Sequence, residues 1–238
     1  MCATGPMVVA AVRAAMAQLE LTPDAIRSVR FIPDTWRRWL GGHVPARQVI
    51  DRHADGGHLA RADLLRYSQE VDDADVSTMK RLFVATMIWG SGTSNGRGPR
   101  NTARALDDER LDSTLRSSHA LVVQNQCGEA YRTFRVGGVG PPFFTKWFWS
   151  ASLAHALHPA PLILDSRVWA SLEAVCWNSI TAAGTRRRAD RYLAYLHAMD
   201  RWSRMMPELG SPEALESVLF QWAGREVRGG GRGGGCWW

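Results

Sequence analysis

The sequence lacks any long apolar run, although apolar residues make up 45% of its 238 residues. No stretch approaches the roughly 20 residues that a membrane-spanning helix requires. The apolar stretch near the N-terminus is interrupted by Arg13 and follows no basic segment, unlike a secretory signal peptide. We therefore expect a globular, cytoplasmic protein with no membrane partner.

Cysteine is scarce and scattered. The four cysteines form no Cys-x-x-Cys pair and stand at Cys2, Cys127, Cys176 and Cys236. Structural zinc and iron–sulfur sites need clustered thiolates, and disulfide frameworks are typical of small, cysteine-dense secreted domains. The sequence therefore predicts no metal site, no cofactor of this kind and no disulfide framework.

Lysine is nearly absent. Of the 29 basic residues, only Lys80 and Lys146 are lysines, and the other 27 are arginines. A genome rich in G and C would account for the arginines. An amine can lose its proton and attack carbon, whereas a guanidinium stays protonated under ordinary conditions. A lysine in such a chain is therefore a candidate nucleophile. Of the two lysines, Lys146 is the stronger candidate because of the residues around it.

The formal net charge of +6 is unevenly distributed. Residues 51–75 carry seven acids against three arginines, and residues 76–150 carry ten basic residues against five acids. A basic segment beside an acidic one favours contact with a polyanion through one face. Arginine enrichment by genome composition explains the charge equally well.

The periodicity of apolar residues is mainly that of helices, with glycine pairs as breaks. We find no series of alternating strands, so the sequence predicts an all-α fold, and the glycine-rich segment 228–238 reads as a disordered tail. Residues 93–100 read as a loop, with Asn101 capping the next helix. Helices are expected near residues 7–19, 23–29, 33–40, 46–53, 60–70, 75–89, 101–106, 166–182, 188–205 and 212–223.

Residues 136–172 contain the most informative pattern. Gly138-Val139-Gly140 forms a tight glycine turn, and the Pro141-Pro142 pair suits the first turn of a helix. Backbone N–H groups of such a turn can bind a phosphate. Lys146 follows about one turn into a helix of aromatic residues, where an amine is shielded from water. The alternative is a surface lysine whose stem covers aromatic side chains.

A second candidate residue follows the end of this helix, expected near His158-Pro159. A short apolar connector leads to Asp165, and the apolar spacing after it indicates a new helix. Asp165 is thus placed at the N-cap, where backbone donors and the helix dipole favour a carboxylate. A purely structural cap is the alternative role.

The pattern Gly138-Val139-Gly140, then Lys146, then eighteen residues, then Asp165 resembles the core of the helix-hairpin-helix DNA glycosylases. The 8-oxoguanine branch is the most similar, and the match continues through Leu153, Ala156-Leu157, Pro159 and Asp165-x-x-x-Trp169. The resemblance implies two helical subdomains flanking a DNA-binding cleft, with Lys146 attacking the sugar C1′ and Asp165 assisting. It also implies a cofactor-free monomer, associated with the nucleoid, that excises a damaged base, 8-oxoguanine foremost, from double-stranded DNA and nicks the strand as an AP lyase.

The resemblance has limits along the chain. It is clear over residues 136–172, plausible over 79–106 and not visible before residue 75. In the family the lysine usually stands two residues after the second hairpin glycine, whereas here Pro141 to Thr145 intervene. We expect one helical glycosylase domain over 1–227, without a β-rich N-terminal domain. It would comprise N-terminal helices over 1–75, a catalytic core over 76–227 and the hairpin at 136–146.

Other residues are weaker candidates. The resemblance places Asn95, Arg97 and Arg100 against DNA, where the loop 94–100 would fill the space left by an extruded base; a plain polar loop is as reasonable. A flipped base stacks well on an aromatic ring, so Phe144, Trp147 and Trp169 are candidates for the base pocket. Aromatic residues at helical spacing are more often core.

Three other functions stay open. The first is a glycosylase for another modified base, such as one carried by phage DNA. The second is a non-catalytic helix-hairpin-helix DNA-binding module, and the third is an arginine-rich nucleic-acid packaging protein. Charge alone supports the last of these, but packaging gives no reason for the spacing between Lys146 and Asp165.

Overall fold

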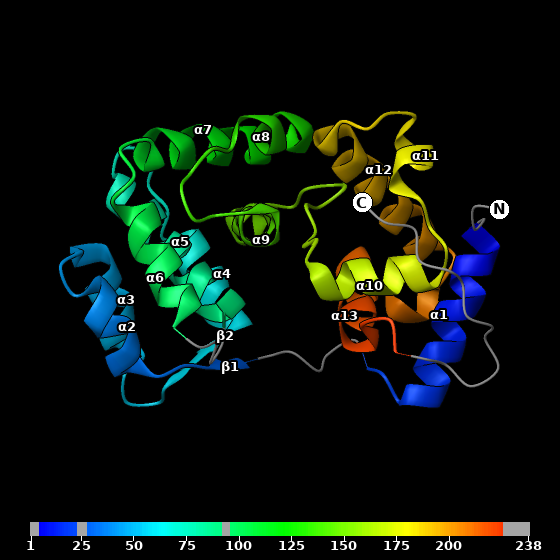
Figure 1. Ribbon diagram of the computed structural model, residues 1–238, viewed down its shortest axis with the longest axis horizontal. Helices are drawn as coiled ribbons and strands as arrows, with labels where there is room; N and C mark the ends of the chain where they lie inside the picture. The colour runs from blue at the N-terminus through cyan, green and yellow to red at the C-terminus, as the bar shows by residue number, and fades with distance from the viewer. Residues whose placement is uncertain (1–4, 23–27, 92–95, 226–238) are drawn as a thin grey trace. The chain divides into compact units, whose positions relative to one another are not determined.

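The computed structural model describes residues 5–22, 28–91 and 96–225, and it divides into two compact units (Figure 1). Unit 1 joins the two ends of the chain, residues 1–26 and 162–238. Unit 2 is the continuous segment 27–161. The residues of the predicted N-terminal helices and of the predicted catalytic core are therefore distributed over both units. The predicted disordered tail lies outside the described residues.

Unit 2 is built around α5 (Val76–Ser91), which is apolar on nearly every side and is therefore buried on nearly every side. Helix α9 (Pro141–Ser152) lies against α5 and has neighbours on its other sides as well (Figure 1). The helices packed around this pair are α3 (Val44–Arg52), α4 (Arg61–Gln69), α6 (Arg97–Leu106), α7 (Leu111–Val123) and α8 (Cys127–Thr133). Helix α2 (Pro33–Leu40) packs on α3 and α6.

The described residues of unit 1 form helices joined by loops, with no strand among them. Its long helix α12 (Arg188–Arg204) packs against α1 (Gly5–Leu19) and α13 (Pro212–Trp222), and α13 also packs against α10 (Ser166–Ala174). The shorter elements are α11 (Ser179–Ala183) and the 3₁₀ turn η1 (Pro207–Leu209). Arg13 of α1 pairs with Glu208 of η1 at 2.7 Å, which links the first helix to residues near the other end of the chain.

The all-α prediction is confirmed, with one small exception in unit 2. Strand β1 (Ser28–Arg30) pairs antiparallel with β2 (His58–Ala60). The predicted helix at 23–29 is therefore wrong at Ser28 and Val29, and its residues 23–27 lie outside the description. Three residues are too short a segment for periodicity to separate a strand from a helix. Among the described residues, none of the helices is long and apolar enough to cross a membrane.

Three helix boundaries also differ from the prediction. Helix α9 ends at Ser152, well before the expected end near His158-Pro159. Helix α6 begins at Arg97, so Asn101 lies inside it and is not its cap. Gly96, at φ +72°, turns the chain into the helix, and Pro99 falls in the first turn, where proline is tolerated.

The helix predicted over 166–182 is in fact two helices. Cys176 adopts φ +56° and the Trp177 N–H donates to the Leu172 carbonyl at 2.9 Å, which closes α10. Asn178 then caps α11.

Candidate functional site

The glycine turn predicted from the sequence joins α8 to α9 in unit 2. Gly138 has φ +82°, a region that residues with a Cβ rarely adopt. A Cβ at this position would lie 2.9 Å from the backbone oxygen of Asn101 in α6. The turn therefore packs directly on α6, and glycine is required both by conformation and by space.

Asp108, which follows α6 closely, holds the same turn by a hydrogen bond. Its Oδ2 accepts the Gly137 N–H at 2.7 Å, and Arg110 donates to both carboxylate oxygens at 2.9 and 2.8 Å. These hydrogen bonds, the Arg110 side chain first, hold the pKa of the Asp108 carboxyl well below its usual range. The carboxylate stays charged at any ordinary pH and keeps the hairpin on α6.

Lys146 lies in the middle of α9 and is only 6% exposed. Its Nζ donates to the Pro142 carbonyl at 3.2 Å and lies 5.7 Å from the centroid of the Phe143 ring. Its stem passes Gly90 of α5, where a Cβ would lie 2.6 Å from Lys146 Cδ. Lys146 is therefore not a surface lysine, and the missing side chain at Gly90 makes room for it.

Lys80 differs from Lys146 in its partner and in its exposure. Its Nζ forms an ion pair with Asp112 at 2.7 Å, and its side chain is 23% exposed. This is an ordinary structural role near the surface of unit 2.

Two of the residues predicted for a base pocket lie in the core of unit 2. Phe144 packs against Tyr131, Phe134 and Phe148, with ring centroids 4.8–5.4 Å away. Trp147 is fully buried, and its Nε1–H donates to Ser118 Oγ at 2.9 Å. Their contacts are those of core side chains, and a role in binding a base stays a prediction.

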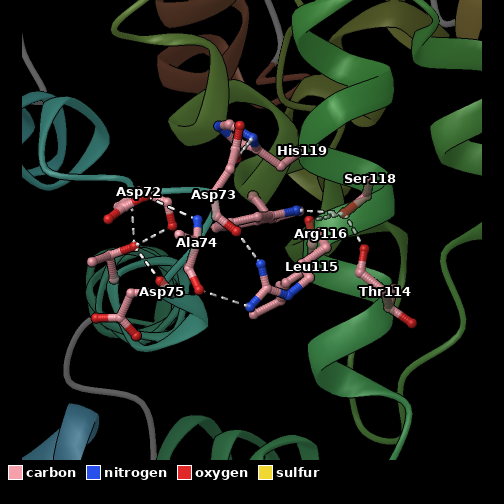
Figure 2. A network of polar contacts seen from close by, with 11 residues as sticks. Asp72, Asp73, Ala74, Asp75, Thr114, Leu115, Arg116, Ser118 and His119 are labelled. Atoms are coloured by element: carbon pink, nitrogen blue, oxygen red, sulfur yellow. Dashed lines mark hydrogen bonds and ion pairs between the residues drawn. The ribbon is translucent and has the colours of Figure 1, made fainter.

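A polar network anchors α7, the helix that supplies Ser118 (Figure 2). Arg116 donates to the carbonyl of Asp73 in the loop before α5, and Ser118 Oγ donates to the Thr114 carbonyl at 2.6 Å. His119 Nδ1 lies 3.4 Å from Asp73 Oδ1, while its Nε2 is buried and has no hydrogen-bond partner among the described residues. Burial, and next the nearby His155, lower the pKa of His119 against the opposing effect of Asp73.

Asp165 lies in unit 1 and is the N-cap of α10, as predicted. Its Oδ1 accepts the N–H groups of Arg167 and Val168 at 3.0 and 3.2 Å. The connector before it is fixed by two hydroxyls of α12, because Tyr192 donates to the Leu162 carbonyl and Tyr195 to the Ile163 carbonyl, each at 2.8 Å. The position of the carboxylate is thus defined within unit 1.

Trp169 belongs to the same unit as Asp165. Its Nε1–H donates to Glu173 at 2.7 Å, and its ring lies near Trp177 and the Arg191 guanidinium. The side chain is partly exposed, so its role in a base pocket stays a prediction.

The residues predicted to contact DNA lie in different surroundings. Asn95 lies outside the described residues, whereas Arg97 and Arg100 are exposed on α6. Val139 donates its N–H to the Val136 carbonyl at 3.3 Å and is mostly buried, so its amide is not available. Gly138 and Gly140 keep the predicted places at the turn.

Sequence reasoning missed the residues that position the candidates. Gly90 and Asp108 act through contacts between segments far apart in the chain, which no local pattern reveals. The spacing of Tyr192 and Tyr195, three residues apart on one helix face, was a usable signal for a pair that works together. Among the described residues, no cluster of three or more His, Cys, Asp or Glu side chains could hold a metal ion.

An all-α chain with a helix–glycine turn–helix and a buried lysine has the features of a helix-hairpin-helix DNA glycosylase. A family model described as "Putative 8-oxoguanine DNA glycosylase OGG-like protein" matches residues 25–220. The chain belongs to this family, which confirms the resemblance seen in the sequence and extends it well before residue 75. No curated protein and no solved structure matches the chain.

Proposed function

We propose that the protein is a bifunctional DNA glycosylase and AP lyase, with Lys146 as the attacking amine and Asp165 as the assisting carboxylate. The substrate is double-stranded DNA containing an oxidised purine, 8-oxoguanine foremost. The enzyme acts as a monomer in the cytoplasm, at the nucleoid, and its own side chains supply the chemistry. Family membership supports the glycosylase class, and the lysine supports the lyase step.

The proposed reaction has two stages. The neutral amine of Lys146 forms a bond to the sugar C1′ as the bond from C1′ to the base breaks, and the base leaves with the electron pair and takes up a proton. The sugar ring then opens to a Schiff base. Loss of a proton from C2′ expels the 3′ phosphate, which breaks the strand by β-elimination.

The burial of Lys146 is the observation that carries this proposal. Removing an ammonium from water costs several kcal/mol, so a fold seldom buries a lysine that does nothing. A buried amine is also protected from water and is held by its helix, which favours attack on a carbon brought to it. Lys146 stands six residues after the last glycine of the hairpin.

Borohydride trapping tests the proposal. Wild type, Lys146→Ala, Asp165→Asn and Lys80→Ala are incubated with duplexes carrying 8-oxoguanine, an abasic site or no lesion, and then reduced. We expect a covalent adduct with wild type and Lys80→Ala, no adduct with Lys146→Ala and a slower reaction with Asp165→Asn. Because Lys80 is the only other lysine, it is a matched control for the loss of an amine.

The duplexes separate the possible outcomes. Trapping on the abasic site but not on 8-oxoguanine would keep the lysine mechanism and reject the substrate. A survey of other modified bases would then follow. No adduct on any duplex, with DNA binding retained, would reject the mechanism in favour of a non-catalytic binding module.

A further inference from the structure

The hairpin offers few backbone donors to a phosphate. The first four N–H groups of an α-helix are normally unpaired, which makes a helix N-terminus a binding site for anions. In α9 the first two residues are Pro141 and Pro142, which have no N–H. The next two, Phe143 and Phe144, both donate to the Gly140 carbonyl, at 2.9 and 3.0 Å. The first turn of α9 therefore presents no N–H to an anion.

The turn itself retains two donors. Gly137 donates to Asp108, and Val139 donates to Val136. Within the described part of the chain, the N–H groups of Gly138 and Gly140 remain without an acceptor. Two neutral amides bring no full charge to a phosphate, so a basic side chain beside the turn would strengthen phosphate binding.

Helix α6 presents that group. Arg97, Arg100 and Arg104 stand at positions i, i+3 and i+7, so they share one exposed face. The opposite face is buried through Gly98, Pro99, Thr102 and Ala105. The three arginines span about 10 Å of helix, which is close to the axial length of three nucleotides of one DNA strand.

Arg104 is the member beside the hairpin. A Cβ at Gly137 would lie 3.5 Å from Arg104 Nε, so the arginine side chain covers the turn. Asp108 is four residues after Arg104, a spacing at which helical ion pairs often form. Its carboxylate is instead bound by Arg110 and Gly137. Among the described residues, Arg104 has no ion pair.

We propose that Arg104, in line with Arg100 and Arg97, supplies the phosphate contact that the two prolines remove from α9. The hairpin then binds one DNA strand through guanidinium groups together with the Gly138 and Gly140 amides. A guanidinium binds phosphate with two hydrogen bonds and a full charge. Asp108 does not oppose this contact strongly, because Arg110 neutralises its charge. The inference takes DNA as the ligand from the proposed function but does not depend on catalysis.

The salt dependence of DNA binding tests this role. The affinity for a duplex with a non-cleavable abasic analogue, and for the same duplex undamaged, is measured at several NaCl concentrations. Each phosphate contact contributes about 0.9 to the slope of log affinity against log salt. We expect Arg104→Gln to reduce the slope by about this amount on both duplexes, and Arg104→Lys to keep the slope while binding more weakly.

Arg66→Gln is the matched control. Arg66 is also exposed and in unit 2, but it is paired with Asp63 at 3.4 Å. We expect its loss to leave the slope unchanged. An unchanged slope for Arg104→Gln, with the far-UV circular dichroism of the wild type, would overturn the inference.

Restoring an amide provides a second test. Pro142→Ala returns an N–H to the first turn of α9 and should tighten binding, most clearly in the Arg104→Gln background. No gain there would overturn the link to the prolines. A reduced slope for Arg104→Gln without any borohydride adduct would keep this inference and reject only the proposed catalysis.

Discussion

Gly90 determines how Lys146 is held, although it carries no functional group. A Cβ at position 90 would lie 2.6 Å from Lys146 Cδ, so a larger residue in the last turn of α5 would displace the Lys146 stem from its observed position. A glycine inside a helix costs about 0.5–1 kcal/mol relative to alanine. At this position the glycine also avoids a close contact with the Lys146 stem, which offsets that cost.

Gly90→Ala is therefore predicted to slow trapping of an abasic duplex by at least about tenfold, because Lys146 is the proposed nucleophile and a small misplacement of such a group has a large effect on rate. Overpacking should also lower the free energy of unfolding by about 1–3 kcal/mol. Both are measured, by single-turnover trapping and by urea unfolding. Gly42→Ala is the control, since nothing lies within 4 Å of a Cβ there. Equal trapping rates for Gly90→Ala and wild type would refute the positioning role.

At the scale of elements, the hairpin between α8 and α9 depends on one glycine for two separate reasons. Gly138 needs its positive φ, and it also needs the space against Asn101. The two requirements can be separated by comparison with Gly210, which has φ +75° but open space around its Cβ position.

Gly210→Ala should cost only the backbone strain, about 1–2 kcal/mol. Gly138→Ala should cost more, because its Cβ also meets a backbone oxygen at 2.9 Å, and should weaken DNA binding as the turn shifts. Urea unfolding and binding to an abasic-analogue duplex measure the two effects. Equal losses of stability in the two variants would show that the contact with Asn101 is unimportant.

The stability of the fold is predicted to depend on pH through His119, at the junction of α7 with the loop before α5. Burial lowers the pKa of His119 in the folded state. Burial also lowers the pKa of His53, the residue that caps the C-terminus of α3. A lowered folded pKa gives a contribution to stability that is present above the unfolded value of about 6.5 and is lost as the pH falls through the folded value.

We therefore expect the melting temperature to fall between about pH 7.5 and pH 5, and to fall less for His119→Gln. The variant removes one proton-binding group, and the remaining decrease includes the contribution of His53. Melting curves across this range test the prediction. A decrease as steep in His119→Gln as in wild type would show that His119 does not contribute.

The sequence predicted elements well where apolar periodicity ran over two turns or more. Helix α5, helix α12 and the cap at Asp165 were predicted because burial on one face and a capping side chain leave local patterns. The start of α6 was missed since Gly96 and Pro99 are typical of loops and also of a helix start. The break after Ala174 depends on the left-handed backbone conformation of Cys176, which cannot be predicted from the residue type.

The sequence led to Lys146 and Asp165 as candidates because their residue types and spacing resemble a family, and their catalytic roles stay a prediction. The structure adds that Lys146 is buried and that Asp165 caps α10. The clamp by Asp108, the space at Gly90 and the side chain of Arg104 over the turn join segments from tens of residues apart. Such contacts arise from tertiary packing, which one sequence does not reveal.

At the scale of the whole molecule, unit 1 depends on both ends of the chain. Helix α1 buries Val8, Val9, Val12 and Ala15, and it packs against α12 and α13. The stability of the last helices therefore depends on residues of α1, as the Arg13–Glu208 pair, 195 positions apart in the sequence, also shows.

Val12→Ala is predicted to destabilise unit 1 by about 2 kcal/mol through loss of two buried methyl groups and the cavity left behind. Hydrogen exchange should accelerate in α12 and α13 as well as in α1. Met7→Ala, at an exposed position of the same helix, should change exchange little. Faster exchange confined to α1 would contradict a shared core.

Unit 2 is one continuous segment of the chain, whereas unit 1 is formed by two separate segments. The two units are therefore complete at different times during synthesis. All of unit 2, with Lys146, is available to fold once residue 161 has left the ribosome. Unit 1 must wait for its second part, residues 162–238, which takes roughly 4–15 s at usual translation rates. During that interval the nascent helix α1 lacks α12 and α13, the helices that cover its apolar face in the folded protein.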